Sequence, residues 1–179
     1  MNPSSGDGKA GGPAAGRPLP PRTLVLADLA GQRGERRLFE HLSLSLGPGE
    51  AAELRGANGT GKTTLLMIVA GIVRAAGGRV EIGGIDPDER AETAIAYLPH
   101  RAAIKGRLTV AENLVFWADM MGAARALVEP ALETVGLLPI AGLAAGYLSA
   151  GQTRRLALAR LAVAERPVWL LDEPTAALD

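Results

Sequence analysis

A short glycine-rich run limits the folds that this chain can adopt. Its residues fit the pattern G-x-x-x-x-G-K-[ST] at every fixed position, as Gly56-Ala57-Asn58-Gly59-Thr60-Gly61-Lys62-Thr63. The apolar segment before it, residues 51–55, predicts a strand, and residues 62–73 have the apolar content and length of a buried helix. A strand, a glycine loop and a helix in this order predict an α/β fold in which the loop binds phosphate.

The residue types in the loop explain this chemistry. Glycines allow the backbone to curl with positive φ, so that several N–H groups point inward, and the helix start adds its positive dipole end. Lys62 supplies a compact charge to the β and γ phosphates, and the Thr63 hydroxyl suits Mg²⁺. The only lysines of the chain are Lys9, Lys62 and Lys105, with arginine used elsewhere. The residues expected to bind the phosphates of a nucleotide are Gly56, Ala57, Asn58, Gly59, Thr60, Gly61, Lys62, Thr63 and Thr64.

Two acids follow the apolar run at 168–171. Buried carboxylates are costly unless a cation or hydrogen bonds compensate them, so two acids at the end of a buried strand favour a site over simple packing. We predict that Asp172 joins Thr63 in holding Mg²⁺. We predict that Glu173 is the general base that polarises a water, which makes Glu173 and Lys62 the expected catalytic residues.

The composition excludes several other kinds of site. The chain has 179 residues, 47% of them hydrophobic, no cysteine, two histidines and a formal net charge of zero. Disulfide scaffolds, thiolate zinc sites and cysteine nucleophiles are therefore excluded, and no global positive field favours nucleic acid as a partner. The apolar run at 65–73 is shorter than a membrane span. The length predicts one domain. Residues 1–21 are rich in glycine and proline with almost no apolar side chains, which predicts a disordered tail before that domain.

The rest of the chain divides into short segments with distinct periodicity. Residues 109–146 have helical periodicity, and a further helix is expected at 149–164, with Arg154 and Arg155 on its polar side. The other expected segments are strands at 23–29, 41–46, 80–82 and 94–98, and a central strand at 168–171 buried on both faces.

Three further motifs carry a family resemblance. The run Leu148-Ser149-Ala150-Gly151-Gln152, the sequence Asp-Glu-Pro-Thr at 172–175 and Ala-Leu-Asp at 177–179 resemble the signature, Walker B and D-loop series of ATP-binding-cassette (ABC) ATPases. The resemblance covers residues 24–179. It implies a P-loop NTPase core with a small antiparallel β subdomain, a helical insertion at about 100–148 and an ATPase domain at 22–179. It also implies a head-to-tail homodimer in which the signature of one copy faces the ATP of the other, with Asp179 in the D-loop.

A finer resemblance lies between the core motifs. The segment at 100–117, with the short helical region and the signature after it, is similar to the ATP-binding subunit of the haem exporter of cytochrome c maturation. This resemblance implies an ATP-hydrolysing subunit on the cytoplasmic face of the bacterial inner membrane. Its partners would be ATP with Mg²⁺ and integral membrane transporter subunits.

The chain departs from the family at three places. His100 occupies the Q-loop position, where most members carry glutamine, and a loop histidine that only docks a partner is as good an account of it as a water contact. Arg33 stands where an aromatic ring usually stacks on adenine, and Phe39 belongs to the following strand. The sequence stops at Asp179, whereas the family continues through a strand whose histidine contacts the γ-phosphate. We therefore expect a fold without its terminal strands, from either a natural truncation or a fragment.

Four functions remain open from the sequence. An ABC transporter ATPase fits best, for haem or for another cargo. An ATP-binding module without competent hydrolysis would follow from the absent histidine strand. A soluble P-loop kinase is disfavoured by Leu148–Gln152, and a soluble ABC protein of ribosomes or DNA repair usually has two cassettes or large insertions.

Overall fold

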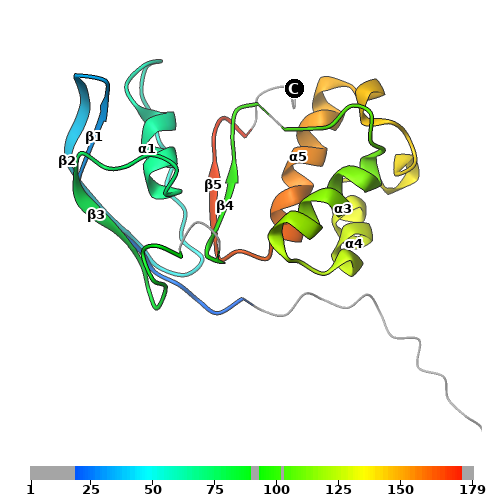
Figure 1. Ribbon diagram of the computed structural model, residues 1–179, viewed down its shortest axis with the longest axis horizontal. Helices are drawn as coiled ribbons and strands as arrows, with labels where there is room; N and C mark the ends of the chain where they lie inside the picture. Colours follow the sequence, from blue (N-terminus) through cyan, green and yellow to red (C-terminus); the bar gives the residue numbers. More distant parts are fainter. Residues whose placement is uncertain (1–18, 90–92, 102, 175–179) are drawn as a thin grey trace, which may run out of the picture.

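The computed structural model describes residues 19–89, 93–101 and 103–174. A three-stranded antiparallel sheet and α1 lie at one end of the molecule, a pair of parallel strands lies in the middle, and three helices lie at the other end (Figure 1). The fold is mixed α/β, as the sequence predicts. None of the helices in the described part of the chain is long and apolar enough to cross a membrane.

The antiparallel sheet has the order β2-β1-β3. Its strands are β1 (Leu24–Arg33), β2 (Arg36–Leu46) and β3 (Gly77–Ile82). The expected strands at 23–29, 41–46 and 80–82 are confirmed, and all three are longer than the sequence pattern indicated. The polar–apolar alternation at 41–46 matches a half-exposed antiparallel strand, since Leu44 of β2 pairs with Leu26 of β1 and β2 forms an edge of the sheet.

Helix α1 (Lys62–Val69) packs on this sheet through Leu65, Ile68 and Val69. The expected helix at 62–73 was too long by one turn. The chain leaves the helix at Ala70, and Gly71 then has a φ of 77°, a conformation open to glycine that stops further helical turns.

The parallel pair consists of β4 (Ile95–Leu98) and β5 (Val168–Leu171). Leu98 pairs with Leu171, so both strands end at the same edge. The expected burial of β5 on both faces was wrong, because Trp169 is 53% exposed. Among the described residues β5 pairs only with β4, and a strand in a two-stranded sheet lacks the neighbours that cover a central strand.

The helical end is built from α3 (Val110–Met121), α4 (Val128–Thr134) and α5 (Ala150–Ala164). Short 3₁₀ turns lie at Arg125–Leu127, Leu138–Ile140 and Ala145–Tyr147. Leu114, Leu132 and Leu156, one from each helix, are at most 1% exposed and meet in one apolar core. The opposite side of α5 packs on β4 through Ala157 and Leu161, so α5 joins the helices to the parallel strands.

Local sequence explains where two of these helices begin. The Thr109 hydroxyl accepts a hydrogen bond from the Glu112 amide, and the Glu112 carboxylate accepts one from the Thr109 amide. Ser149 and Gln152 form the same reciprocal arrangement at α5. Each pair satisfies two amides that a helix start otherwise leaves without partners.

The strand expected at 51–55 was also wrong. These residues are exposed, and neither sheet of the described structure includes them. Ala51, Ala52 and Glu53 have low strand propensity, and a strand needs a hydrogen-bonding neighbour to persist. The glycine loop is therefore preceded by irregular backbone.

Candidate nucleotide-binding site

The glycine loop ends directly at α1. Gly61 is the N-terminal cap of this helix and has a φ of 106°, which a residue with a side chain rarely adopts. A Cβ at Gly61 would lie 3.0 Å from Leu38 Cβ and 3.3 Å from Phe39 Cδ1. The loop therefore lies against β2, and only glycine fits this approach.

Lys62 folds its side chain back over the loop. Its Nζ donates hydrogen bonds to the carbonyls of Gly56, at 2.6 Å, and Ala57, at 3.0 Å. The Thr60 hydroxyl also donates to the Ala57 carbonyl, at 2.9 Å. The ammonium thus lies at the mouth of the loop, where a phosphate would meet it together with the first amides of α1.

Thr63 and Asp172 bring the two halves of the site together. The Thr63 hydroxyl donates a hydrogen bond of 2.9 Å to Asp172 Oδ2. Asp172 is only 6% exposed, and its amide continues the β4–β5 ladder by donating to the Leu98 carbonyl. The end of β5 therefore fixes the carboxylate against the start of α1.

The charge of Asp172 reaches a neighbouring tyrosine. The pKa of the Tyr97 hydroxyl on β4 is raised above its usual value, first by burial and then by the negative charge of Asp172. Both effects disfavour the phenolate.

Glu173 lies beside His100 at the shared edge of β4 and β5. His100 Nδ1 is 2.9 Å from Glu173 Oε2, and both side chains are more than half exposed. The parallel register explains this pair, because each residue lies two positions beyond the paired Leu98 and Leu171. Glu173 has a φ of 51°, an uncommon conformation for a residue with a side chain.

Arg154 was expected on the polar side of α5 and is instead 5% exposed. Its guanidinium donates to the carbonyls of Asp172 at 2.9 Å, Glu173, Pro174 at 3.0 Å and Pro99 at 3.4 Å. The spacing of residues in the sequence could have indicated this burial, because Arg154 lies three and seven residues before the buried Ala157 and Leu161. That spacing places all three on one face of a helix.

The signature residues Leu148, Ser149, Ala150, Gly151 and Gln152 lie at the start of α5. Ser149 and Gln152 use their side chains to cap the helix, and Tyr147 just before them is 80% exposed. Helices α1 and α5 flank the β4–β5 pair on opposite sides (Figure 1). Within one chain the signature and the glycine loop thus belong to separate ends of the fold.

The motifs and this geometry can be compared with known proteins. A family model described as ABC transporter matches residues 39–176. This chain belongs to the ABC transporter family. It is an ABC transporter ATP-binding subunit, and its family implies ATP hydrolysis with Mg²⁺.

Curated relatives include proteins of one kind within this family. The cytochrome c biogenesis ATP-binding export protein CcmA of Agrobacterium fabrum is 51% identical over 162 residues, which are 87% of this chain and 76% of that protein. CcmA of Chelativorans sp. is 50% identical over 159 residues, covering 87% of this chain and 78% of that protein. This chain is therefore shorter than these relatives.

Solved ABC structures share the fold. A putative ABC transporter ATP-binding protein from Pyrococcus furiosus superposes with a TM-score of 0.79 at 26% identity, over 88% of this chain and 78% of that one. A dimeric ATP-binding cassette in a post-hydrolysis state with ADP and phosphate gives a TM-score of 0.74 at 26% identity, over 87% and 76% of the two chains.

The oxygen atoms of this ABC site suit Mg²⁺. A hydroxyl and a carboxylate are ligands that Mg²⁺ prefers, and Thr63 and Asp172 already place theirs 2.9 Å apart. Mg²⁺ is usually held by one or two such protein ligands together with substrate phosphates and waters. No cluster of three or more His, Cys, Asp or Glu is found in the described residues.

Two other predicted positions contribute less to the described site. Arg33 is exposed at the tip of the β1–β2 hairpin, where it pairs with Arg36. Phe39 lies beside the glycine loop, since a Cβ at Gly61 would be 3.3 Å from its Cδ1. The D-loop residue Asp179 and Thr175 lie outside the described residues, as does most of the expected tail.

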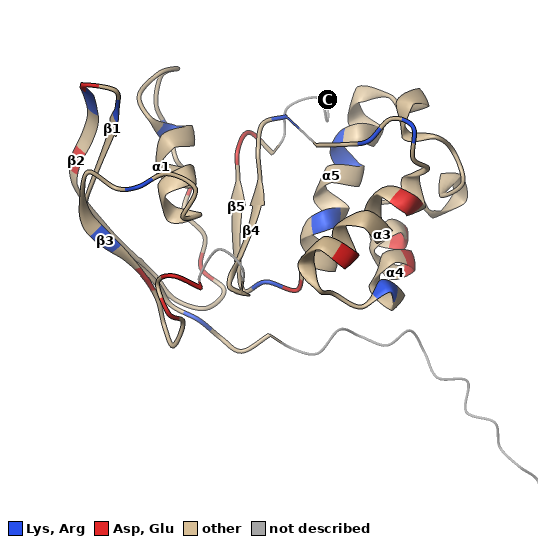
Figure 2. Ribbon diagram, in the orientation of Figure 1, with Lys and Arg blue, Asp and Glu red and all other residues tan. Residues whose placement is uncertain are grey.

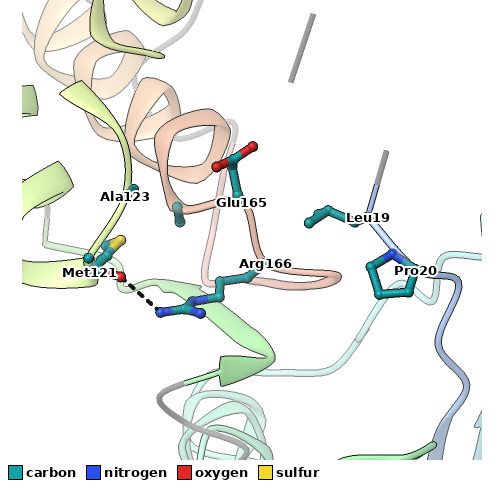
Figure 3. Close-up of a pocket in the computed structure, with 8 residues that line it drawn as sticks. Leu19, Pro20, Met121, Ala123, Glu165 and Arg166 are labelled. Atoms are coloured by element: carbon teal, nitrogen blue, oxygen red, sulfur yellow. Dashed lines mark hydrogen bonds between the residues drawn. The ribbon is translucent and has the colours of Figure 1, made fainter. Parts of the chain in front are cut away.

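A surface hollow of about 490 Å³ lies away from these motifs. Figure 3 shows Leu19 and Pro20 facing Glu165 and Arg166, with the Arg166 guanidinium donating to the Met121 carbonyl at 3.2 Å. None of the residues predicted to bind ATP lines this hollow. The candidate site is therefore the loop and strand-end region rather than the hollow.

Proposed function

We propose that this chain binds and hydrolyses MgATP as the motor subunit of a haem exporter that serves c-type cytochrome biogenesis. One observation carries the proposal for the chemistry. The Thr63 hydroxyl at the start of α1 lies 2.9 Å from the buried Asp172 carboxylate, directly before Glu173. This contact supports the proposal, because it brings the start of α1 next to the two acids that follow β5, although 109 positions separate Thr63 from Asp172.

Each residue has a physical role in the proposed reaction. Residues 56–64 bind the phosphates through backbone amides, and the Lys62 ammonium neutralises their charge. Thr63 and Asp172 would hold Mg²⁺, which neutralises phosphate charge when bound. Glu173 orients the attacking water and accepts its proton at a carboxylate oxygen. His100, 2.9 Å from Glu173 Oε2, holds that carboxylate in place.

The proposed active form is a head-to-tail homodimer. Leu148–Gln152 lies at the start of α5, away from the loop of its own chain, and the amides of a helix start suit an anion. In the dimer the signature of one copy would complete the phosphate site of the other. The solved post-hydrolysis cassette, which is dimeric with ADP and phosphate, supports this arrangement.

The relatives support a proposal for the cargo and for the location. CcmA proteins about 50% identical to this chain are cytochrome c biogenesis ATP-binding export proteins. We infer that the chain acts on the cytoplasmic face of the bacterial inner membrane, bound to integral membrane subunits that carry haem. Nucleic acid is not among the proposed partners, since the chain has no net charge.

Two experiments test this function. Purified Glu173→Gln should bind MgATP as the unchanged chain does and release phosphate at least about 100-fold more slowly, with Glu133→Gln as an exposed control on α4. Expression in a bacterium that lacks its own CcmA should restore c-type cytochromes. Normal ATP turnover without this restoration would reassign the cargo.

A second function is the ATP-binding module without hydrolysis. Phosphate release equal to that of Lys62→Ala, together with retained MgATP binding, would establish it.

A further inference from the structure

Arg154 is a buried cation whose partners are all backbone carbonyls. The residue is 5% exposed, and none of the ion pairs found in the described part of the chain includes it. Burying a charge without an opposite charge is costly unless hydrogen bonds replace its solvation. The charge of Arg154 is therefore stabilised by the carbonyl dipoles that surround it. The same hydrogen bonds fix the positions of those carbonyls.

Three of these carbonyls belong to consecutive residues after β5. The Arg154 Nη2 atom donates to Asp172 and Glu173, and its Nε donates to Pro174. Such a fork fixes the direction of three peptide groups at once, which a single point charge cannot do.

The turn held in this way is strained. Glu173 has a φ of 51°, although it precedes Pro174, and a residue before proline favours extended backbone. A left-handed conformation outside glycine costs about 1–3 kcal/mol and persists only where its surroundings enforce it. The hydrogen bonds from Arg154 to the carbonyls on either side of this residue provide that enforcement.

Arg154 also reaches the end of β4. Its Nη1 lies 3.4 Å from the Pro99 carbonyl, and the next residue, His100, contacts Glu173. The one guanidinium thus links the loops that follow both parallel strands.

The same residue is rigidly connected to the signature. Arg154 lies five positions after Ser149 in α5, and the helix is locked by the buried Leu156 and Ala157 that follow. Figure 2 shows basic residues on α5 and acidic residues on α3 and α4. The Arg154 guanidinium donates its hydrogen bonds to carbonyls at the strand ends. A displacement of the start of α5 would therefore move the Asp172–Pro174 turn.

We propose that Arg154 is a positioning residue that sets the Asp172–Pro174 turn, and with it the Glu173 carboxylate, from the signature helix of the same chain. This inference rests on the proposed function for the role of Glu173. It assigns to Arg154 the link between the two phosphate-facing surfaces of one subunit.

The test compares Arg154→Gln and Arg154→Lys with Arg155→Gln in the full chain. Arg155 is a matched control, since its guanidinium donates to the Val135 carbonyl within the helical end. Two quantities are measured: hydrogen–deuterium exchange in the peptide spanning 168–174, and steady-state ATP hydrolysis with MgADP binding by calorimetry.

We expect Arg154→Gln to accelerate exchange at Asp172 and Glu173 and to lower kcat by about 100-fold, since small misplacements of reacting groups have effects of this size. KM and MgADP affinity should stay within about threefold. Arg154→Lys keeps the charge and three donors, so it should recover part of both properties. Arg155→Gln should match the unchanged chain.

Equal exchange and equal kcat in Arg154→Gln and Arg155→Gln would overturn the inference. If Arg154→Gln does not fold, Arg154→Lys is compared with Arg155→Gln. Equal exchange and equal kcat in these two variants would overturn the inference. If the unchanged chain shows no turnover, the proposed hydrolysis fails, while the exchange comparison still decides whether Arg154 sets the turn.

Discussion

The Thr63 hydroxyl donates a hydrogen bond of 2.9 Å to Asp172 Oδ2, although 109 positions separate the two residues in the sequence. The contact depends on α1 starting at the glycine loop and on β5 ending beside it. It joins a hydroxyl and a buried carboxylate that both suit Mg²⁺. Several measurable consequences follow from this arrangement and from the residues around it.

Asp172→Asn should weaken Mg²⁺-dependent nucleotide binding. The substitution retains an oxygen for the Thr63 hydrogen bond but removes the negative charge that a divalent cation needs. We expect an apparent Mg²⁺ affinity about 10- to 100-fold lower, as for other losses around metal sites. Calorimetric MgATP binding at several Mg²⁺ concentrations measures it. Asp119→Asn, at an exposed acid paired with Arg125, is the control, and an equal Mg²⁺ response in both variants would exclude the role of Asp172.

Lys62→Ala should abolish most nucleotide binding. The ammonium that donates to Gly56 and Ala57 is the charge at the mouth of the loop, and hydrogen bonds to charged groups contribute about 1.5–3 kcal/mol each. Losing this contribution corresponds to a Kd increased by about 10- to 100-fold. Lys105→Ala is the matched control, since that ammonium lies 4.4 Å from the Phe116 ring centroid. Similar Kd values for the two variants would contradict the role of Lys62.

His100→Ala should lower kcat while changing KM little. The imidazole lies 2.9 Å from the Glu173 carboxylate, so its removal frees that side chain to rotate. A decrease of about 2- to 10-fold is expected for the loss of one positioning hydrogen bond. His100→Gln, which keeps a donor, should recover most of the rate. An unchanged kcat in His100→Ala would exclude the positioning role and favour the role in docking a partner.

Thr109→Ala should destabilise the chain by about 1 kcal/mol at neutral pH, the usual effect of losing a helix cap. The pKa of Glu112 is lowered from 4.5, first by its hydrogen bond from the Thr109 amide and then by the Thr109 hydroxyl. A lowered folded-state pKa means that the carboxylate stabilises the fold above pH 4.5 and loses this contribution as the pH falls through the lowered value. Thr109→Ala keeps the backbone amide and removes only the contribution of the hydroxyl, so the stability difference between the two proteins should shrink in acid by that part.

Urea unfolding at pH 7 and at acid pH measures this effect. Thr134→Ala is the control, because the Thr134 hydroxyl donates to the Pro130 carbonyl within α4 and caps no helix start. A difference between unchanged chain and Thr109→Ala that stays constant with pH would contradict the coupling to Glu112.

Much of the fold was predictable because it depends on local patterns. The alternation at 41–46 predicted an antiparallel strand, and Ser149 marked the start of α5. The family resemblance extended this to the whole architecture, and the family is confirmed. The roles assigned to individual site residues remain predictions for the experiments above.

Three features escaped the sequence because they depend on neighbours that are distant in the chain. Residues 51–55 looked like a strand, but they have no pairing partner in the described sheets. Trp169 was expected to be buried and is 53% exposed, since β5 pairs with β4 alone. Arg154 was expected in solvent and is buried under the carbonyls of Asp172, Glu173 and Pro174.

The sequence by itself determined the glycine loop, the helix caps and the order of the acids after β5, because hydrogen bonds within a few residues decide such features. Only the tertiary structure decided that Thr63 meets Asp172, that His100 meets Glu173 and that Arg154 holds the turn between them. The first contact follows from the position of α1 beside the end of β5, and the other two follow from the parallel register of β4 and β5 and from the packing of α5 on β4. A register is a property of two strands together, so neither strand encodes it alone.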